Sequence, residues 1–272
     1  MQLSSENFLA AVEWNQCCMF NLFHGLPGVE IHRPAPNSDF FSILTETSLP
    51  VFNNVLRVRV SSEQVREVVH QFTERCKVKR APAMWWISPL TTPADLASVL
   101  SDHGWQLMDE QPVGMSADLK SVQDYSLLRP GSEEMLIRPV EQAEHFHAFS
   151  QLLTEVFELS SSAVHIITDM FSHPDFDLQR SFLHYLGFLN GHPVAAGSVF
   201  IKDNVAGIYN VCVSPDARKR GFGETMTRYL LYISRQNGCK RSVLQSSLMA
   251  KRLYERMGFE QCGAFKLFLL ND

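Results

Sequence analysis

The residues best suited to chemistry lie in one stretch, IYNVCVSPDARKRGFG, at positions 208–223. Three basic residues at 218–220 come directly before Gly221 and Gly223, and a helical pattern comes after them. Glycine lets the backbone approach a ligand closely, and the first N–H groups of a helix have no partner inside the helix. The helix dipole and the basic side chains add positive charge at the same place. The stretch therefore predicts a cradle for a phosphate-like anion.

The neighbours of this stretch support a strand before the glycines and a helix after them. Val211 and Val213 fit the strand, and the amphipathic spacing of Met226, Leu230 and Ile233 fits the helix. The stretch lacks the Lys-Ser/Thr pair of a nucleotide triphosphate loop and the third glycine of a dinucleotide fingerprint. We therefore do not expect the anion to belong to ATP or NAD.

Two blocks of sequence carry a resemblance to a known family. The first is Val213-Ser214-Pro215 followed by RKRGFG at 218–223, which resembles the pattern Arg/Gln-x-x-Gly-x-Gly/Ala after a strand ending in Val-x-Pro. The second is AKRLYERMGF at 250–259, which resembles the segment Ala-x-x-Leu-Tyr…Gly-Phe. In this order the blocks resemble the GNAT superfamily of acetyl-CoA-dependent N-acetyltransferases. The resemblance is good from Leu136 onward and faint before it.

The resemblance implies acetyl-CoA as co-substrate, with its pyrophosphate on the backbone amides of 218–223 and its pantetheine arm along the strand that ends at Val213. It implies that Tyr254 protonates the departing thiolate. Because the cysteines have no accompanying histidine pattern for zinc, we expect no metal. Ser247 stands where the family often has an asparagine that contacts the cofactor. The cofactor-binding residues so implied are Val211, Val213, Arg218, Lys219, Arg220, Gly221, Phe222, Gly223 and Ser247.

The general base stays open at this stage. On strand alternation, Tyr209 and Gly207 share a face with Val211 and Val213, and neither is a good base at neutral pH. Ordered water is one alternative. A residue from elsewhere is the other, and the candidates are His173, Asp175, Asp177 and His184.

Composition bounds the class of protein. The chain has 272 residues, 45% of them hydrophobic, which is enough for one large or two ordinary domains. A net charge of −5 argues against a general nucleic-acid coat. No apolar run is long enough to cross a bilayer and the N-terminal segment lacks a targeting pattern, so we expect a cytoplasmic protein. The six cysteines show no Cys-x-x-Cys spacing and are interpreted as buried or semi-buried thiols.

The pattern of the whole chain favours an α/β fold, with two tandem domains that each have a mostly antiparallel sheet flanked by helices. Residues 96–105 align with 250–259 at a constant offset, which places Gly104 on Gly258 and Leu100 on Tyr254. The first copy has no glycine loop and no basic tripeptide. We therefore predict a degenerate domain over 1–120, a linker over 121–134 and a catalytic domain over 135–272.

The leading functional hypothesis is transfer of an acetyl group from acetyl-CoA to a primary amine by direct attack. The alternatives are a non-catalytic acyl-CoA sensor or scaffold, and an enzyme that uses another acyl-CoA. Residues 160–179 and 29–50 are expected to shape the acceptor pocket, and their acidic bias suits a cationic amine as well as it suits a solvated loop. The acceptor can be a small molecule or a protein amine, and a homodimer stays open.

Overall fold

The computed structural model describes residues 5–35, 39–120, 135–172 and 181–271. The chain forms two compact units, one of residues 1–115, 245–252 and 260–272, and one of 116–244 and 253–259. Most of the segment 245–272 thus groups with the first half of the chain, whereas the sequence analysis assigns all of 135–272 to one domain. The proposed linker at 121–134 lies outside the described residues.

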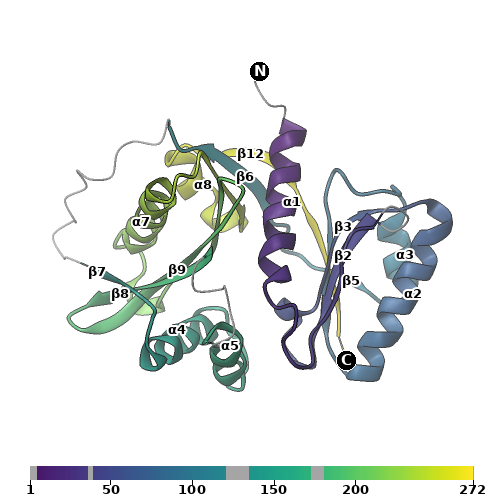
Figure 1. The fold of residues 1–272 in the computed structure, drawn as a ribbon, viewed down its shortest axis with the longest axis horizontal. Coiled ribbons are helices and arrows are strands. Elements are labelled where there is room, and N and C mark those ends of the chain that lie inside the picture. Colours follow the sequence, from purple (N-terminus) through teal and green to yellow (C-terminus); the bar gives the residue numbers. More distant parts are fainter. Residues whose placement is uncertain (1–4, 36–38, 121–134, 173–180, 272) are drawn as a thin grey trace. The chain divides into compact units, whose positions relative to one another are not determined.

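The first sheet is built mainly from the N-terminal half of the chain (Figure 1). Its strand order is β1-β2-β3-β4-β13-β5. The strands are β1 (Glu30–His32), β2 (Asp39–Leu44), β3 (Asn54–Arg59), β4 (Ala83–Ile87), β5 (Gln106–Leu107) and β13 (Lys266–Leu270). The accompanying helices are α1 (Ser5–Asn21), η1 (Pro50–Phe52), α2 (Ser62–Lys79) and α3 (Leu96–Asp102). Only the pair β3–β4 is parallel among the pairs that join these strands.

An aromatic cluster lies between the first sheet and helices α2 and α3. The rings of Trp85 and Trp105 meet edge to face at 5.4 Å, and Phe72 packs against both. The Trp105 indole N–H donates to the Thr73 hydroxyl at 2.9 Å, so this polar atom is satisfied inside the core. The cluster fixes the helices on the sheet of the first unit.

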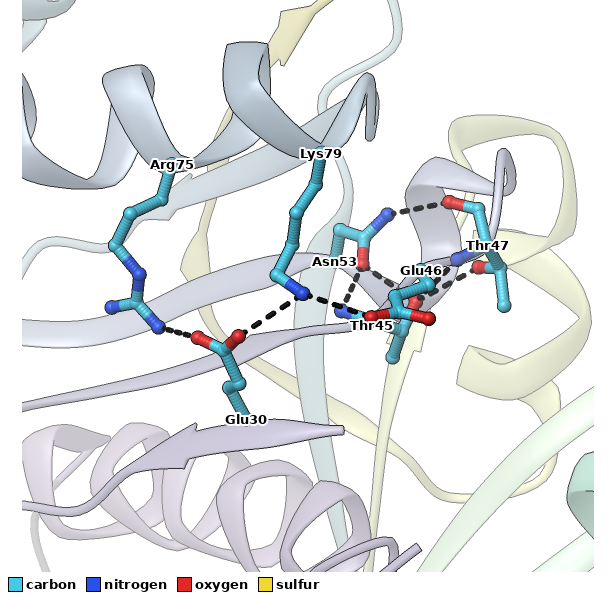
Figure 2. A network of polar contacts seen from close by, with 7 residues as sticks. All are labelled: Glu30, Thr45, Glu46, Thr47, Asn53, Arg75 and Lys79. Atoms are coloured by element: carbon cyan, nitrogen blue, oxygen red, sulfur yellow. Dashed lines mark hydrogen bonds and ion pairs between the residues drawn. The ribbon is translucent and has the colours of Figure 1, made fainter. Parts of the chain in front are cut away.

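A polar network on the first unit is shown in Figure 2. Glu30 pairs with Arg75 and, at 3.1 Å, with Lys79, and the Arg75 hydrogen bond lowers the pKa of the Glu30 carboxyl. Beside this pair, the buried Asn53 side-chain oxygen accepts from the Thr45 N–H at 2.7 Å and from the Thr45 hydroxyl at 2.8 Å. Each charge has an opposite partner and the amide is fully bonded, so we interpret the network as structural.

The second sheet has the strand order β12-β6-β11-β10-β9-β8-β7. Its strands are β6 (Val113–Asp118), β7 (Leu136–Pro139), β8 (Phe182–Leu189), β9 (His192–Lys202), β10 (Val205–Val213), β11 (Arg241–Ser246) and β12 (Glu260–Ala264). The helices are α4 (Ala143–Val156), α5 (Ala163–Ser172), η3 (Pro215–Ala217), α7 (Phe222–Gln236) and α8 (Leu248–Arg256). Each strand from β7 to β10 pairs antiparallel with the next strand in the chain, and β10 pairs parallel with β11. Among the described residues, no helix is long and apolar enough to span a bilayer.

Helices cover both faces of the strands β8 to β10, with α7 on one face and α4 on the other (Figure 1). Two neighbouring residues of β9 show this alternation. A Cβ at Gly197 would meet Leu230 of α7 at 2.8 Å, so glycine is needed for the close approach of that helix. Ser198 points the opposite way and bonds His184, whose ring lies 5.1 Å from that of Phe149 on α4.

From β1 and from β8 onward, and apart from the short helices η1 and η3, the two halves repeat the order of three strands, a helix, a strand, a helix and two strands. The last strands of the two halves are exchanged between the sheets. β13 lies beside β4 in the first sheet, and β6 lies beside β11 in the second. The local geometry repeats as well, since Gly104 and Gly258 have φ of 87° and 88°. The N–H of the aromatic residue after each glycine bonds the carbonyl of Leu100 or Tyr254 at 3.1 Å. This agreement supports the internal duplication.

Candidate active site

The candidate cradle is the loop between β10 and α7. The short helix η3 turns the chain after β10, and Lys219 and Gly221 then take positive φ of 62° and 86°. Gly221 is the N-cap of α7, and as a glycine it has no side chain that could cap the helix. The first bond of the helix runs from the Thr225 N–H to the Gly221 carbonyl at 3.0 Å. The N–H groups of the first turn are therefore available to an anion.

The edge of β10 that faces β11 is paired over only part of its length. Parallel pairing with β11 covers 205–207, whereas antiparallel pairing with β9 continues to Val213. The register with β9 shifts between Tyr209 and Cys212, and Asn210 has a φ of 56° there, which marks a β-bulge. The Ser214 N–H bonds the Val194 carbonyl on the β9 side, so by alternation the backbone groups of Val213 face the other edge.

The basic side chains lie around the loop. Arg218 is exposed, and its Nε–H donates to the Val213 carbonyl at 3.4 Å. The Arg220 guanidinium lies over the ring of the buried Phe222, 4.8 Å from the ring centre. Lys219 is exposed at the left-handed position between them. The loop therefore combines cationic side chains with an open helix N-terminus.

Gly221 has a positive φ that favours glycine, whereas Gly223 does not. A Cβ at Gly221 would meet nothing within 4 Å, so only its φ of 86° requires glycine in the protein alone. A Cβ at Gly223 would lie 3.6 Å from Val213 Cγ2 and 4.0 Å from Leu253 Cδ2, which are ordinary contacts. The fold itself therefore leaves room at both positions for a side chain, and it is a close ligand that would need the space.

Tyr254 lies on α8 and is buried, with 7% of its surface exposed. Its side chain hydrogen-bonds Thr227 on α7, and the Thr227 hydroxyl donates to the Gly223 carbonyl at 2.8 Å. Burial raises the pKa of Tyr254 to about 12, so the phenol stays protonated at neutral pH and has a proton to donate. The chain of hydroxyls ties Tyr254 to the start of the helix that carries the cradle.

Ser247 begins α8. Its hydroxyl accepts the Ala250 N–H at 3.3 Å, and its carbonyl accepts from Lys251 at 3.1 Å. These bonds make Ser247 the N-cap of the helix, which is a sufficient structural reason for a serine at this position. Its contact with a cofactor stays a prediction.

The first half of the chain has no such cradle among its described residues. Its strand β3 leads directly into α2, where Ser61 is the N-cap. The Ser61 hydroxyl accepts the Gln64 N–H at 3.3 Å, and the Gln64 side chain accepts the Ser61 N–H at 3.1 Å. This capping box satisfies N–H groups at the N-terminus of α2, whereas the N-terminus of α7 has no side-chain cap in the part of the chain that the structure describes.

The sequence analysis named His184 as one candidate base but did not predict the polar cluster that surrounds it in the second unit. His184 of β8 bonds Ser198 of β9 at 2.7 Å, and Asn210 of β10 donates to the same serine at 3.2 Å. These residues are far apart in the sequence and carry no motif, so only the strand register brings them together. His173, Asp175 and Asp177 lie outside the described residues. Among the residues that are described, no group of three or more His, Cys, Asp or Glu is placed to hold a metal ion.

The comparison with protein families identifies the domain. Residues 146–259 match the model of the acetyltransferase (GNAT) family, and this segment contains both the cradle loop and Tyr254. This part of the chain is therefore a GNAT domain, which supports an acyltransferase. The resemblance seen in the sequence is confirmed.

Solved structures extend the likeness over the whole chain. A GCN5-related N-acetyltransferase from Kribbella flavida has a TM-score of 0.69 at 15% identity, with 98% of this chain and 95% of that chain covered. A tandem GNAT protein from the clavulanic acid biosynthesis pathway has a TM-score of 0.63 at 13% identity, with 98% and 96% covered. The mixed α/β fold with two tandem GNAT-like domains is thereby confirmed. Among curated proteins there is no significant match.

Proposed function

We propose that the chain is an N-acetyltransferase that transfers an acetyl group from acetyl-CoA to a primary amine. The observation that carries the proposal is the uncapped N-terminus of α7 beside the partly unpaired edge of β10. The pyrophosphate binds the amides of 218–223, with Arg218 and Lys219 adding charge. The pantetheine amides pair with the free edge of β10 near Val211 and Val213, as an added strand would.

The chemical step is direct attack. The neutral amine nitrogen forms a bond to the thioester carbonyl carbon, the C–S bond breaks, and the electron pair leaves on sulfur. Tyr254 gives its proton to the thiolate, and the proton released by the amine restores the phenol through solvent. The products are an amide and free CoA.

His184 is not the general base in this account. Burial lowers its pKa to about 3, so the imidazole does not take up a proton at neutral pH. Deprotonation of the amine is assigned to water, and most of the rate to the positioning of amine and thioester.

A thiol-release assay tests the proposal. The purified protein is supplied with acetyl-CoA and a panel of primary amines, and a parallel series replaces acetyl-CoA with succinyl-CoA. We expect CoA release that depends on the amine and is faster with acetyl-CoA. Tight acetyl-CoA binding without release for any amine would instead support an acyl-CoA sensor.

A further inference from the structure

A pocket of about 160 Å³ lies on the α4 side of the second sheet. Its walls are largely aromatic, with Phe146, Phe171 and Phe182 around His184. The His184 ring is stacked on Phe171 at 4.7 Å and lies 4.5 Å from Phe182. The Nε2 atom of His184 is buried and has no hydrogen-bond partner among the described residues. A buried polar atom without a hydrogen bond is destabilising. A ligand that forms a hydrogen bond with this nitrogen would remove that cost.

The hydrogen bonds around Ser198 indicate which kind of partner the Nε2 atom of His184 lacks. The Ser198 hydroxyl is fully buried and has two described partners, Asn210 and His184. Asn210 donates its amide N–H to the serine oxygen, which leaves Nδ1 of His184 as the one described partner that can accept the buried serine proton, and we assign the proton to that bond. Nε2 then carries the proton of the neutral ring. The pocket therefore needs a hydrogen-bond acceptor.

Charge narrows the class of acceptor. The residues that line the pocket include no lysine or arginine, and His184 stays neutral because burial lowers its pKa. Glu141, which is exposed, adds a negative charge to the lining. A carboxylate or phosphate would be repelled and would find no counter-ion. The missing partner is thus a neutral oxygen, such as a hydroxyl or a carbonyl.

The pocket is connected to the proposed reaction site. The chain His184–Ser198–Asn210 crosses three strands and ends at the β-bulge of β10, next to the strand residues proposed to hold pantetheine. The volume suits one aromatic ring, since a cavity of about 150 Å³ lined by apolar side chains accepts benzene. Four phenylalanine rings lie within 6.2 Å of the His184 ring, so binding of an oxygen at the buried Nε2 requires one of them to move.

We propose that this pocket binds the non-reacting part of the acceptor, an apolar group of about the size of benzene that carries a neutral hydroxyl or carbonyl oxygen for His184. The assignment to the acceptor rests on the proposed function, whereas binding of such a group does not. A substrate of this class is an aryl-alkyl amine with an oxygen on its ring or side chain.

Binding is tested without any acyl-CoA. The protein is labelled with 15N-histidine, and its imidazole signals are recorded with benzyl alcohol and with toluene as matched probes. We expect His184 to show the Nε2–H form and benzyl alcohol to shift its signal, with about 5- to 10-fold tighter binding than toluene, as one hydrogen bond provides. An Nδ1–H form, or equal binding of both probes, would overturn the proposal.

Variants assign the signal and protect the test against misfolding. His184→Phe keeps an aromatic ring but removes the donor, so the preference for benzyl alcohol should vanish. His147→Phe changes an exposed histidine of α4 in the same way and should leave the preference intact. Ser198→Ala keeps His184 but removes the proton given to Nδ1, so the signal of the Nε2–H form should weaken. An unchanged tautomer in Ser198→Ala would contradict the assignment of the serine proton to Nδ1 of His184.

The activity arm separates the two proposals. Tyramine, which carries a ring hydroxyl, and phenethylamine, which lacks it, are compared as acceptors. A lower KM for tyramine that is lost in His184→Phe is expected. Turnover with other amines but no binding of benzyl alcohol would remove the pocket proposal alone. Selective binding of benzyl alcohol without turnover of any amine would remove the enzymatic proposal and leave the binding site.

Discussion

Arg57 and Asn210 hold the same backbone conformation at the same step of the two halves, with φ of 53° and 56°. Each lies at a register shift of its strand, shortly after the parallel pairing with the next strand ends. The bulge of the proposed active strand is therefore present in both copies. The copies differ in the segment after the strand, which is a capping box at Ser61 in one and an uncapped glycine loop in the other.

Ser61→Ala tests the structural role of the first helix N-terminus. The substitution removes the cap of α2 and should lower the free energy of unfolding by about 1 kcal/mol. Urea denaturation measures this, with the exposed Ser62→Ala as control. Acetyl-CoA binding should be unchanged in both variants. A loss of binding in Ser61→Ala would mean that the first unit contributes to the cofactor site.

Tyr254→Phe tests the proton donor. The ring that packs 5.8 Å from Phe259 is kept and only the hydroxyl is lost. Turnover should fall by about 100-fold, as removal of a general acid does, while acetyl-CoA affinity stays nearly constant. Steady-state kinetics and calorimetry measure the two quantities, with the more exposed Tyr232→Phe as control. Unaltered turnover would leave Tyr254 with a packing role alone.

Acid should destabilise the protein through His184. Its pKa falls from 6.5 to about 3 on folding because the ring is desolvated. Between these values the unfolded state binds more protons, so the free energy of unfolding decreases as pH decreases. From about pH 8 to about pH 5 this loss is about 2 kcal/mol.

Urea unfolding of the wild type and of His184→Phe at both pH values checks this acid effect. The variant should lose about 2 kcal/mol less than the wild type. The exposed His147→Phe should lose as much as the wild type. Equal losses in the wild type and in His184→Phe would show that His184 is not held neutral.

Local patterns in the sequence predicted much of the fold. The hairpin turn at Asn190 and Gly191 has the positive φ values of 51° and 81° that this pair favours. The strand and helix expected around 208–237 are β10 and α7. The repeat of 96–105 in 250–259 holds down to single backbone hydrogen bonds.

Tertiary pairing was not readable from the sequence. The residues 266–270 pair with β4 and not with a strand of their own half. Their local pattern does not predict this pairing, because strand exchange leaves each local pattern unchanged. Arg57 and Asn210 have positive φ without a glycine to signal it. The pocket at His184 depends on the register of three strands, which periodicity does not specify.

The central claim is that one acyl-CoA binds at the N-terminus of α7, and calorimetric titration with acetyl-CoA tests it. Gly221→Val and Gly238→Val are matched variants, because both glycines have positive φ, 86° and 77°, and a Cβ at either would meet nothing within 4 Å. Both should lose similar stability, but only Gly221 lies at the cradle. We predict close to one acetyl-CoA per chain in the wild type and in Gly238→Val, and none in Gly221→Val. Equal binding in all three proteins would contradict the account.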